Sequence, residues 1–358
     1  MQSTRQRYLT IAATISLAII ATLRVTLETK PHNNILSLQH NRLHKCRCKY
    51  RAKYNCYQKI GVTVPKELCL EPISTKLSAA SYAEQLQRRR EILIDGKISK
   101  IEIGNNAEAF SAIQNLAWDH IKAVFGETPR TAHKSLNEKE LKAAIAEAKN
   151  RLAADAALRQ ALIETYFKAV YASPETLFEV PRLRVVKPIF DETARARAGQ
   201  DFPAAFAAHR DTWYANPTSQ INLWVALHDV KASETFVFYP QLFKQAVQNG
   251  SAQFAYEKFK TQAGFGNSQW YSADLYPYAS QDLASQDEYG FALKQGEAIL
   301  FAADHLHRTL AHDSDKMRFS LDLRGCHPGD KEAGLCAPGI DNQSQGDAIC
   351  DYRPAQPF

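Results

Sequence analysis

Apolar residues recur with a helical period through most of the first half of the chain. Between residues 106 and 125 they fall near one face, as an amphipathic helix requires. The apolar positions of this helix are Ala107, Phe110, Ile113, Leu116, Ala117, Ile121 and Val124. Helices are likewise expected over residues 78–92, 135–154 and 155–172. One of them begins with the capping-box pattern Ser135-Leu-Asn-Glu138. The region 71–173 is therefore predicted to be mainly helical.

After the break at Ser173-Pro174, apolar and polar residues alternate instead. The run Met317-Arg-Phe-Ser-Leu-Asp-Leu-Arg324 predicts a strand with one polar and one apolar face. Further strands are expected over residues 181–188, 225–230, 235–240 and 296–301, a helix over 243–262, and a polar, aromatic loop over 263–290. Helices followed by many strands predict helices packed against a β-sandwich or barrel. The fold class is thus α+β with a mainly β core.

The N-terminal region differs in composition from the rest of the chain. Residues 8–23 are almost entirely apolar, a length short for a spanning helix, which needs about 20 residues. Residues 1–30 are interpreted as a hydrophobic leader or membrane anchor, with an over-extended gene start as the third alternative. Residues 31–70 are interpreted as a basic, cysteine-containing, poorly ordered linker.

The charge and the cysteine spacing argue against two functions for the chain after residue 70, namely nucleic-acid binding and a cysteine-ligated zinc site. Residues 1–70 carry twelve Lys or Arg against Glu28 and Glu67, a net of +10, so the remainder of the chain carries −4. A mildly acidic body argues against a nucleic-acid partner. The cysteine spacings lack the paired knuckles of a zinc site, and residues 71–325 contain no cysteine at all. Residues 326–358 are separated as a C-terminal tail.

A histidine and a carboxylate, His209 and Asp211, stand two positions apart. On an extended strand they point to the same side. They would supply two of the three ligands of a two-histidine, one-carboxylate Fe(II) site. The alternative is a surface turn in which Asp211 caps its own backbone.

The third ligand must come from another strand. Among the later histidines, only His305, His307 and His312 follow a hydrophobic strand and precede the alternating strand that begins at Arg318. A guanidinium on the inner face of that strand requires a carboxylate partner, which a bound dicarboxylate such as 2-oxoglutarate would supply. An internal salt bridge from Arg318 or Arg324 to Asp322 or Asp304 is the alternative.

These motifs resemble the phytanoyl-CoA dioxygenase family of Fe(II)/2-oxoglutarate oxygenases. In that family the distal histidine is followed two positions later by Ser or Thr, and eleven positions later by the arginine that holds the 2-oxoglutarate C5 carboxylate. His307, Thr309 and Arg318 fit these intervals, whereas His305 does not. The resemblance therefore implies the metal ligands His209, Asp211 and His307. His312 and Arg324 are interpreted as supporting or substrate-side residues.

The resemblance covers roughly residues 175–325. It implies a double-stranded β-helix (cupin-like jelly roll) over 174–325, which together with the helices forms a dioxygenase domain over 71–325. It also implies Fe(II) with 2-oxoglutarate and O2 as co-substrates, and oxidative decarboxylation of 2-oxoglutarate to succinate and CO2. Halogenating members lack the carboxylate ligand, so the presence of Asp211 favours hydroxylation or a related oxidation. The expected substrate is a small molecule.

The remaining candidate residues each have two interpretations. The amides of Gln220 and Asn222 either bind the co-substrate or form a satisfied polar pair inside the barrel. Trp213, Tyr214 and Trp224 are assigned to the substrate pocket, with core packing as the alternative. His228 is expected to be structural. Arg182, Arg184 and Lys187 either bind an anionic substrate or form a solvated strand face.

Two other functions stay open at this point. The first is a catalytically silent jelly-roll domain that binds a ligand and is tethered to a membrane through residues 8–23. The second is an oxygenase that acts on a protein side chain. The supply of cytosolic iron and 2-oxoglutarate favours a cytoplasmic catalytic domain, whereas the hydrophobic leader argues for a membrane or exported form. No obligate protein partner is evident.

Overall fold

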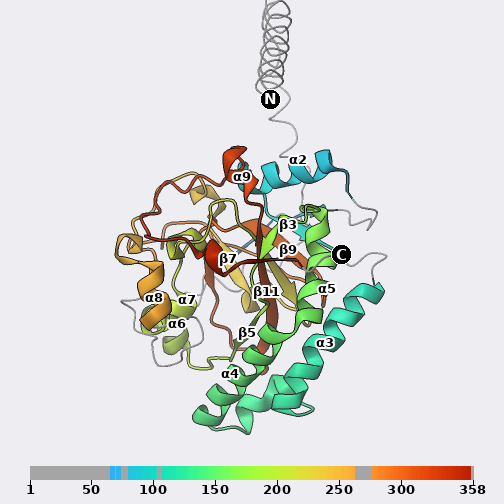
Figure 1. The fold of residues 1–358 in the computed structure, drawn as a ribbon. Coiled ribbons are helices and arrows are strands. Elements are labelled where there is room, and N and C mark those ends of the chain that lie inside the picture. The colour runs from blue at the N-terminus through green and yellow to red at the C-terminus, as the bar shows by residue number, and fades with distance from the viewer. Residues whose placement is uncertain (1–64, 69, 74–79, 103–106, 263–275, 356–358) are drawn as a thin grey trace, which may run out of the picture. The chain divides into compact units, whose positions relative to one another are not determined.

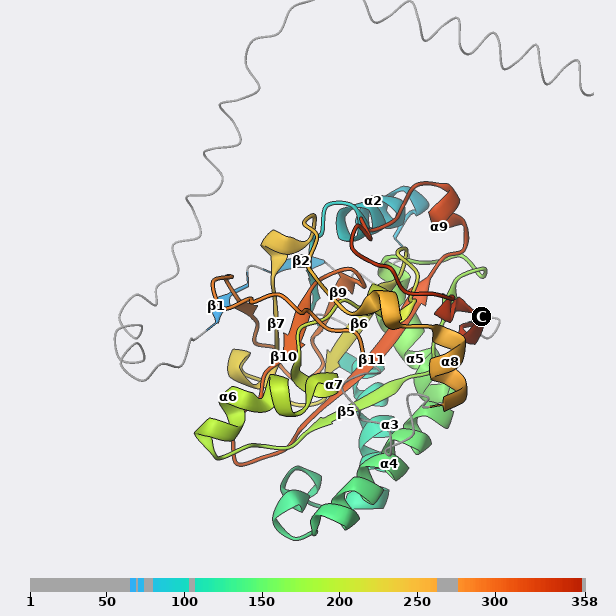
Figure 2. The ribbon, with the colours of Figure 1, turned by 90° about the vertical axis from the view of Figure 1, so that its left-hand side faces the viewer.

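Two β-sheets form the centre of the protein (Figures 1 and 2). The larger has the order β12-β4-β11-β6-β9-β3-β2, with β5 also paired to β11, and the smaller has the order β1-β8-β7-β10. The strands of the larger sheet are β2 (Glu71–Ile73), β3 (Ser99–Ile101), β4 (Leu177–Phe178), β5 (Arg182–Val186), β6 (Ile221–Ala226), β9 (Ala298–Ala302), β11 (Arg318–Cys326) and β12 (Arg353–Pro354). Those of the smaller sheet are β1 (Lys66–Glu67), β7 (Phe236–Phe238), β8 (Tyr289–Gly290) and β10 (His307–Thr309).

The computed structural model describes residues 65–68, 70–73, 80–102, 107–262 and 276–355. The predictions for the leader, and for the linker up to residue 64, lie outside the described residues. Within the described residues, no helix is long and apolar enough to cross a membrane. The apolar run 8–23 lies outside them.

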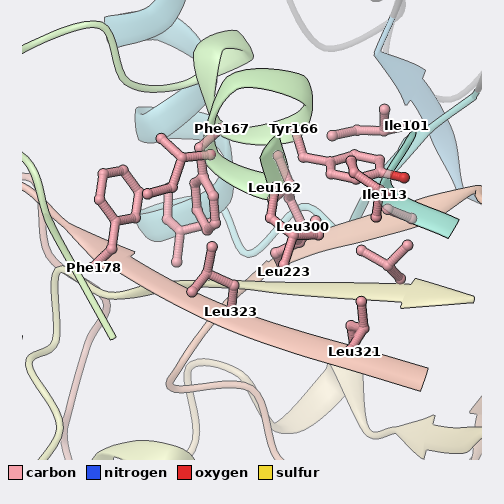
Figure 3. Packing of buried hydrophobic residues seen from close by; sticks show 14 of the residues in the cluster. Ile101, Ile113, Leu162, Tyr166, Phe167, Phe178, Leu223, Leu300, Leu321 and Leu323 are labelled. Carbon is pink, nitrogen blue, oxygen red and sulfur yellow. The ribbon is translucent and has the colours of Figure 1, made fainter. Parts of the chain in front are cut away.

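Helices cover the outer face of the larger sheet, where α3, α4 and α5 gather on one side (Figure 1). The helices are α2 (Tyr82–Leu93), α3 (Ala107–Phe125), α4 (Glu138–Ala154), α5 (Ala156–Tyr166), α6 (Glu192–Asp201), α7 (Pro203–Phe206), α8 (Tyr256–Gln262) and α9 (Gly329–Glu332). Leu321 and Leu323 of β11 pack toward Leu162 of α5 in one hydrophobic cluster (Figure 3). Burial of this face ties the helices to the sheet.

The opposite face of β11 is polar, as the alternation predicts, and carries Arg318, Ser320, Asp322 and Arg324. Beside it, a second hydrophobic cluster joins Trp224 and Phe301 of the larger sheet to Phe236 and Phe238 of the smaller one. This cluster identifies the inner layer between the sheets. The fold therefore places a row of charged side chains next to an aromatic core.

Three local predictions are wrong. The helix expected over 243–262 is confined to α8, because Phe243, Val247 and Phe254 pack into three different clusters instead of one face. The segment after His209 is a 3₁₀ helix, Asp211–Tyr214, and not a strand. The helix α4 is capped by Asn137 and Glu140, two residues later than the pattern at Ser135 predicts.

The segment separated as a tail packs against the sheet from residue 326 to residue 355. Strand β12 pairs with β4, and the guanidinium of Arg159 donates hydrogen bonds to carbonyls of both strands, those of Phe178 and Arg353, at 3.1 and 2.7 Å. Cys326, Cys336 and Cys350 are free thiols. This segment therefore belongs to the folded unit that surrounds the site.

Gly296, in the turn before β9, offers a test of the helix–sheet packing. Its φ is 85°, and a Cβ at this position would lie 1.8 Å from the ring of Phe110 in α3. Gly126 also has a positive φ, 75°, but a Cβ there would meet nothing within 4 Å. We expect Gly126→Ala to lower the free energy of unfolding by about 1 kcal/mol through backbone strain, and Gly296→Ala by about 3 kcal/mol because steric overlap is added.

Urea denaturation followed by circular dichroism measures both changes. Equal losses in the two variants would contradict the packing of Phe110 against the turn.

Candidate metal centre

His209 and His307 face each other on neighbouring backbone segments. The amide nitrogen of each donates a hydrogen bond to the carbonyl oxygen of the other, at 2.9 and 3.0 Å. This pairing is an isolated antiparallel bridge, and it brings the two ring centroids to 4.5 Å. Residues almost a hundred positions apart are thus fixed side by side by main-chain bonds alone.

Both imidazole rings are held in the same way. Nδ1 of His209 lies 3.0 Å from the carbonyl oxygen of Ala207, and Nδ1 of His307 lies 2.9 Å from that of His305. A carbonyl only accepts, so each Nδ1 carries the proton. Nε2 of each ring keeps its lone pair, which is the form of histidine that binds a metal.

Asp211 completes the group. Its amide donates to the carbonyl of Ala303 at 2.9 Å, which places the 3₁₀ helix beside the end of β9. Oδ1 of Asp211 lies 3.6 Å from Nε2 of His209. One ligand atom from each of Asp211, His209 and His307 lies within 4.8 Å of the others. The structure therefore brings together the three residues that the sequence singled out, with His307 and not His305 as the third.

The protonation states of the three side chains suit a cation. Burial and the neighbouring His307 lower the pKa of His209 to about 3, and burial lowers the pKa of His307 as well. Burial alone would raise the pKa of Asp211, but the Arg324 guanidinium and the two histidines hold it well below its usual range. Two neutral imidazoles and one carboxylate result, a donor set that fits Fe(II).

A buried polar network holds Asp211 from behind. Its Oδ2 accepts a hydrogen bond from Nδ2 of Asn222 at 2.7 Å and lies 3.1 Å from a guanidinium nitrogen of Arg324. Nε2 of Gln220 in turn donates to Oδ1 of Asn222 at 2.6 Å, and the Tyr352 hydroxyl donates to Gln220. The amides expected to bind the co-substrate are thus engaged within the protein. We replace that prediction with a positioning role toward Asp211.

Arg318 lies on the inner face of β11 without a carboxylate. The side chain is buried, and its guanidinium stands 5.6 Å from the ring of Trp224. One Nη donates to the carbonyl of Glu234 at 3.3 Å, while Nε has no hydrogen-bond partner. Arg318 forms no salt bridge with any residue that the structure describes, and burial lowers its pKa to about 10. The guanidinium therefore stays charged at neutral pH and needs an anion.

Two hydroxyl groups belong to the same region. Ser320, two residues along the inner face of β11, is buried and its Oγ has no hydrogen-bond partner. Thr309 is two residues from His307 on β10 and pairs with Phe236, whose ring packs against Trp224. The aromatic cluster links the histidine to the arginine, since the Phe236 and His307 ring centroids are 5.6 Å apart. Unpartnered donors on this inner face fit a bound dicarboxylate.

The aromatic candidates separate into three roles. Trp213 is fully buried in a hydrophobic cluster, and its Nε1 donates to Asp341 at 2.8 Å, so the substrate-pocket prediction for Trp213 is replaced by core packing. Trp224 packs against Arg318, as described above. Tyr214 lies edge-on to His209 at 5.5 Å and also contacts Phe254 and Tyr276. Phe254 and Tyr276 line a cavity of about 350 Å³.

Among the described residues, the other histidines of the catalytic half do not join the centre. His305 is sandwiched between Phe238 and Phe243. His228 accepts a hydrogen bond from the amide of Phe319 at 3.1 Å, which agrees with its expected structural role. His312 lies 2.9 Å from the hydroxyl of Ser314 and near Arg318, on the supporting side of the site.

Sequence reasoning missed Arg210, which stands between the two ligands on the chain. It is fully buried and lies 3.1 Å from Asp341, and it donates to the carbonyls of Leu242 and Gln245, both at 2.8 Å. Because Arg210 alternates with His209 and Asp211, the sequence indicated that its side chain points into the protein. Nothing in the sequence indicated that its partner is Asp341, 131 residues away.

The model of the phytanoyl-CoA dioxygenase family matches residues 92–320, well over half of the chain and inclusive of all three candidate ligands and Arg318. The chain belongs to the phytanoyl-CoA dioxygenase family. It is therefore an enzyme of the non-haem, 2-oxoglutarate-dependent oxygenase type, which is a class of oxidoreductases. The predicted cofactor set of Fe(II), 2-oxoglutarate and O2 is confirmed by this membership, together with the His-Asp-His group.

The solved structures that match this chain are distant. The epimerase SnoN in complex with Fe3+, alpha ketoglutarate and nogalamycin RO is 14% identical, covers 76% of this chain and 95% of its own, and has a TM-score of 0.35. The carbocyclase SnoK from nogalamycin biosynthesis is 12% identical, with 79% and 94% covered and a TM-score of 0.35. The assignment rests on the family match and not on these likenesses. A comparison with curated proteins gave no match.

The hydrogen bond from Asn222 to Asp211 provides a test of the supporting network in this phytanoyl-CoA dioxygenase family member. Asn222→Ala should lower Fe(II) affinity about 10- to 100-fold, because outer partners orient the ligating carboxylate. Anaerobic competition with a chelator measures the affinity. The exposed Asn150 on α4 provides the matched control, since Asn150→Ala removes an amide far from the ligands. Unchanged affinity in Asn222→Ala would contradict the positioning role.

Proposed function

We propose that this protein is an Fe(II)/2-oxoglutarate-dependent dioxygenase that hydroxylates a small-molecule substrate while 2-oxoglutarate is oxidatively decarboxylated to succinate and CO2. The observation that carries the proposal is the convergence of the Nε2 atoms of His209 and His307 with the Asp211 carboxylate, together with a buried arginine, Arg318, that forms no salt bridge with any described residue. The double-stranded β-helix that the family resemblance implies is part of the same proposal, because two packed sheets support it.

His209, Asp211 and His307 would hold the Fe(II) ion. Bound Fe(II) supplies the activation of O2 that is coupled to decarboxylation of the co-substrate. The protein contributes the orientation: Nδ1–H bonds to backbone carbonyls fix both imidazoles, and Asn222 and Arg324 fix the carboxylate. With three protein ligands, coordination positions would remain available for the co-substrates.

Arg318 would bind the C5 carboxylate of 2-oxoglutarate, with the hydroxyls of Thr309 and Ser320 as further donors. The free Nε of Arg318 and the unpartnered Oγ of Ser320 support this placement, since buried donors require acceptors. The rings of Trp224 and Phe236 exclude water from the same region. A carboxylate held there is bound by a charge-assisted hydrogen bond in apolar surroundings.

The kind of oxidation follows from the carboxylate ligand. Asp211 is present and buried, so the position that halogenating family members leave open for halide is filled. Tyr214 would contact the substrate; its ring contacts with His209 and with Phe254 and Tyr276, which line the cavity, support this role. Hydroxylation is therefore the oxidation that this arrangement favours.

The metal ligands are tested by single substitutions. His307→Ala and Asp211→Ala should each abolish succinate formation from 2-oxoglutarate, since two ligands do not retain the ion. Succinate and bound iron are measured on the same purified samples. His327→Gln, a change of a histidine outside the centre, should leave both values unchanged. Full turnover in either ligand variant would contradict the assignment.

The co-substrate site is tested at Arg318. Arg318→Gln should raise the Kd for 2-oxoglutarate about 100-fold while iron binding persists, because one charged partner of a buried pair is lost. The two affinities are measured anaerobically by equilibrium dialysis. Arg197→Gln removes an exposed arginine of α6 and serves as the control. Loss of iron together with 2-oxoglutarate in Arg318→Gln would show a general structural defect and refute the specific role.

A further inference from the structure

Arg184 projects from β5 onto the same inner face as the candidate 2-oxoglutarate site. Its chain neighbours Leu183 and Val185 pack with the hydrophobic cluster under the helices, so Arg184 points to the opposite side of the strand. In the register of β5 with β11, Arg184 stands directly across from Ser320. It therefore lies beside the hydroxyl assigned to the co-substrate and on the edge of the polar row.

The Nε atom of Arg184 is held by a carboxylate, and the side chain is partly accessible to solvent. Its Nε donates to Oδ2 of Asp322 at 2.6 Å. The Arg184 side chain is 45% exposed, whereas that of Asp322 is 17% exposed. Among the described residues, Nε is the nitrogen of Arg184 that has a hydrogen-bond partner. Asp322 thus fixes the direction of the side chain and leaves the Nη1–Nη2 edge open to solvent.

An open, oriented guanidinium edge suits one kind of ligand. Its planar fork of donors matches the two oxygens of a carboxylate or phosphate group, and orientation in advance reduces the entropy lost on binding. A free surface arginine would lack this orientation. The contact with Asp322 therefore distinguishes Arg184 from the exposed Lys187 three positions later, which has no comparable anchor among the described residues.

Other arginines of this face are engaged by different carboxylates. Arg182 and Arg324 both lie near Glu179, at 2.6 and 3.6 Å, and Arg324 also contacts Asp211. Arg184 is therefore the partly exposed guanidinium of this row, and Asp322 is the carboxylate that it contacts.

Strand β11 connects Arg184 to the metal centre. Arg184 contacts Asp322, and Arg324, two residues further along the same face of β11, lies 3.1 Å from Asp211. A ligand group bound at Arg184 is thus close enough to orient the rest of a small molecule toward the candidate iron site. The position differs from that of Arg318, which is buried.

We propose that Arg184, held by Asp322, binds a carboxylate or phosphate group of the substrate, so that the substrate is a small organic anion. This inference rests on the proposed function, because it assigns the substrate class of that same site. Arg184 is a specificity-determining residue in this account, and Arg318 serves the co-substrate.

Affinity selection tests the proposal on the full chain. The protein is loaded anaerobically with Fe(II) and 2-oxoglutarate and mixed with a panel of small carboxylic acids and phosphate monoesters. Each acid is paired with its neutral amide and each phosphate with its parent alcohol. After ultrafiltration, mass spectrometry quantifies the retained compounds. We expect the anionic members to be retained and the neutral members to be lost, and the retained anions show whether the ligand group is a carboxylate or a phosphate.

Two variants and one control define the role of Arg184. Arg184→Gln should lower the retention of the anions about 10- to 100-fold, since a charge-assisted pair is lost. Arg184→Lys keeps the charge near Asp322 but loses the fork, and it should lower retention about threefold to tenfold. Lys187→Gln removes one positive charge nearby on the chain and should retain the anions as the wild type does.

Several outcomes would overturn the inference. They are equal retention of the neutral partners, undiminished retention by Arg184→Gln, and the absence of any retained anion in the wild type. The bound 2-oxoglutarate is quantified in the same samples. Its loss in Arg184→Gln would assign Arg184 to the co-substrate and overturn the substrate role. Its absence from the wild type would mean that the proposed function itself fails, which keeps the two failures distinguishable.

Discussion

The site depends on one reciprocal pair of backbone hydrogen bonds between His209 and His307. These two bonds join the segment before the 3₁₀ helix to β10, and no side chain is needed to form them. Once the backbones are paired, both imidazoles project to the same place, and their Nδ1–H groups find carbonyls two residues back. The geometry of the candidate iron ligands is thus a consequence of strand pairing.

A second set of interactions determines the charges around these ligands. Arg324 and Asn222 keep Asp211 ionised and oriented, and Arg318, which forms no salt bridge with a described residue, lies farther along the same strand. Because β11 alternates strictly, its apolar residues attach the helices while its polar residues build the site. One face of β11 therefore stabilises the fold, and the other face carries residues of the site. A one-residue shift in the pairing of β11 would turn both sets of side chains to the wrong face.

The sequence predicted the structure correctly where local periodicity or a fixed interval between two residues determined it. Alternation predicted both faces of β11, and the intervals to Thr309 and Arg318 selected His307 over His305. The sequence did not predict the contacts of a side chain that has several possible partners nearby. Gln220 and Asn222 were recognised as inward-facing, but only the fold shows that Tyr352 and Asp211 satisfy them. The direction of Trp213 likewise depends on Asp341, far along the chain.

The central claim is that one centre binds Fe(II) and 2-oxoglutarate together, and an anaerobic titration of the full chain tests it most directly. Fe(II) is added first and 2-oxoglutarate second, and the weak visible charge-transfer band of the chelate is recorded. The account predicts a band in the wild type that is absent in His307→Ala and needs more 2-oxoglutarate in Arg318→Gln. A folded wild-type protein that gives no band, or a band that persists without His307, would contradict it.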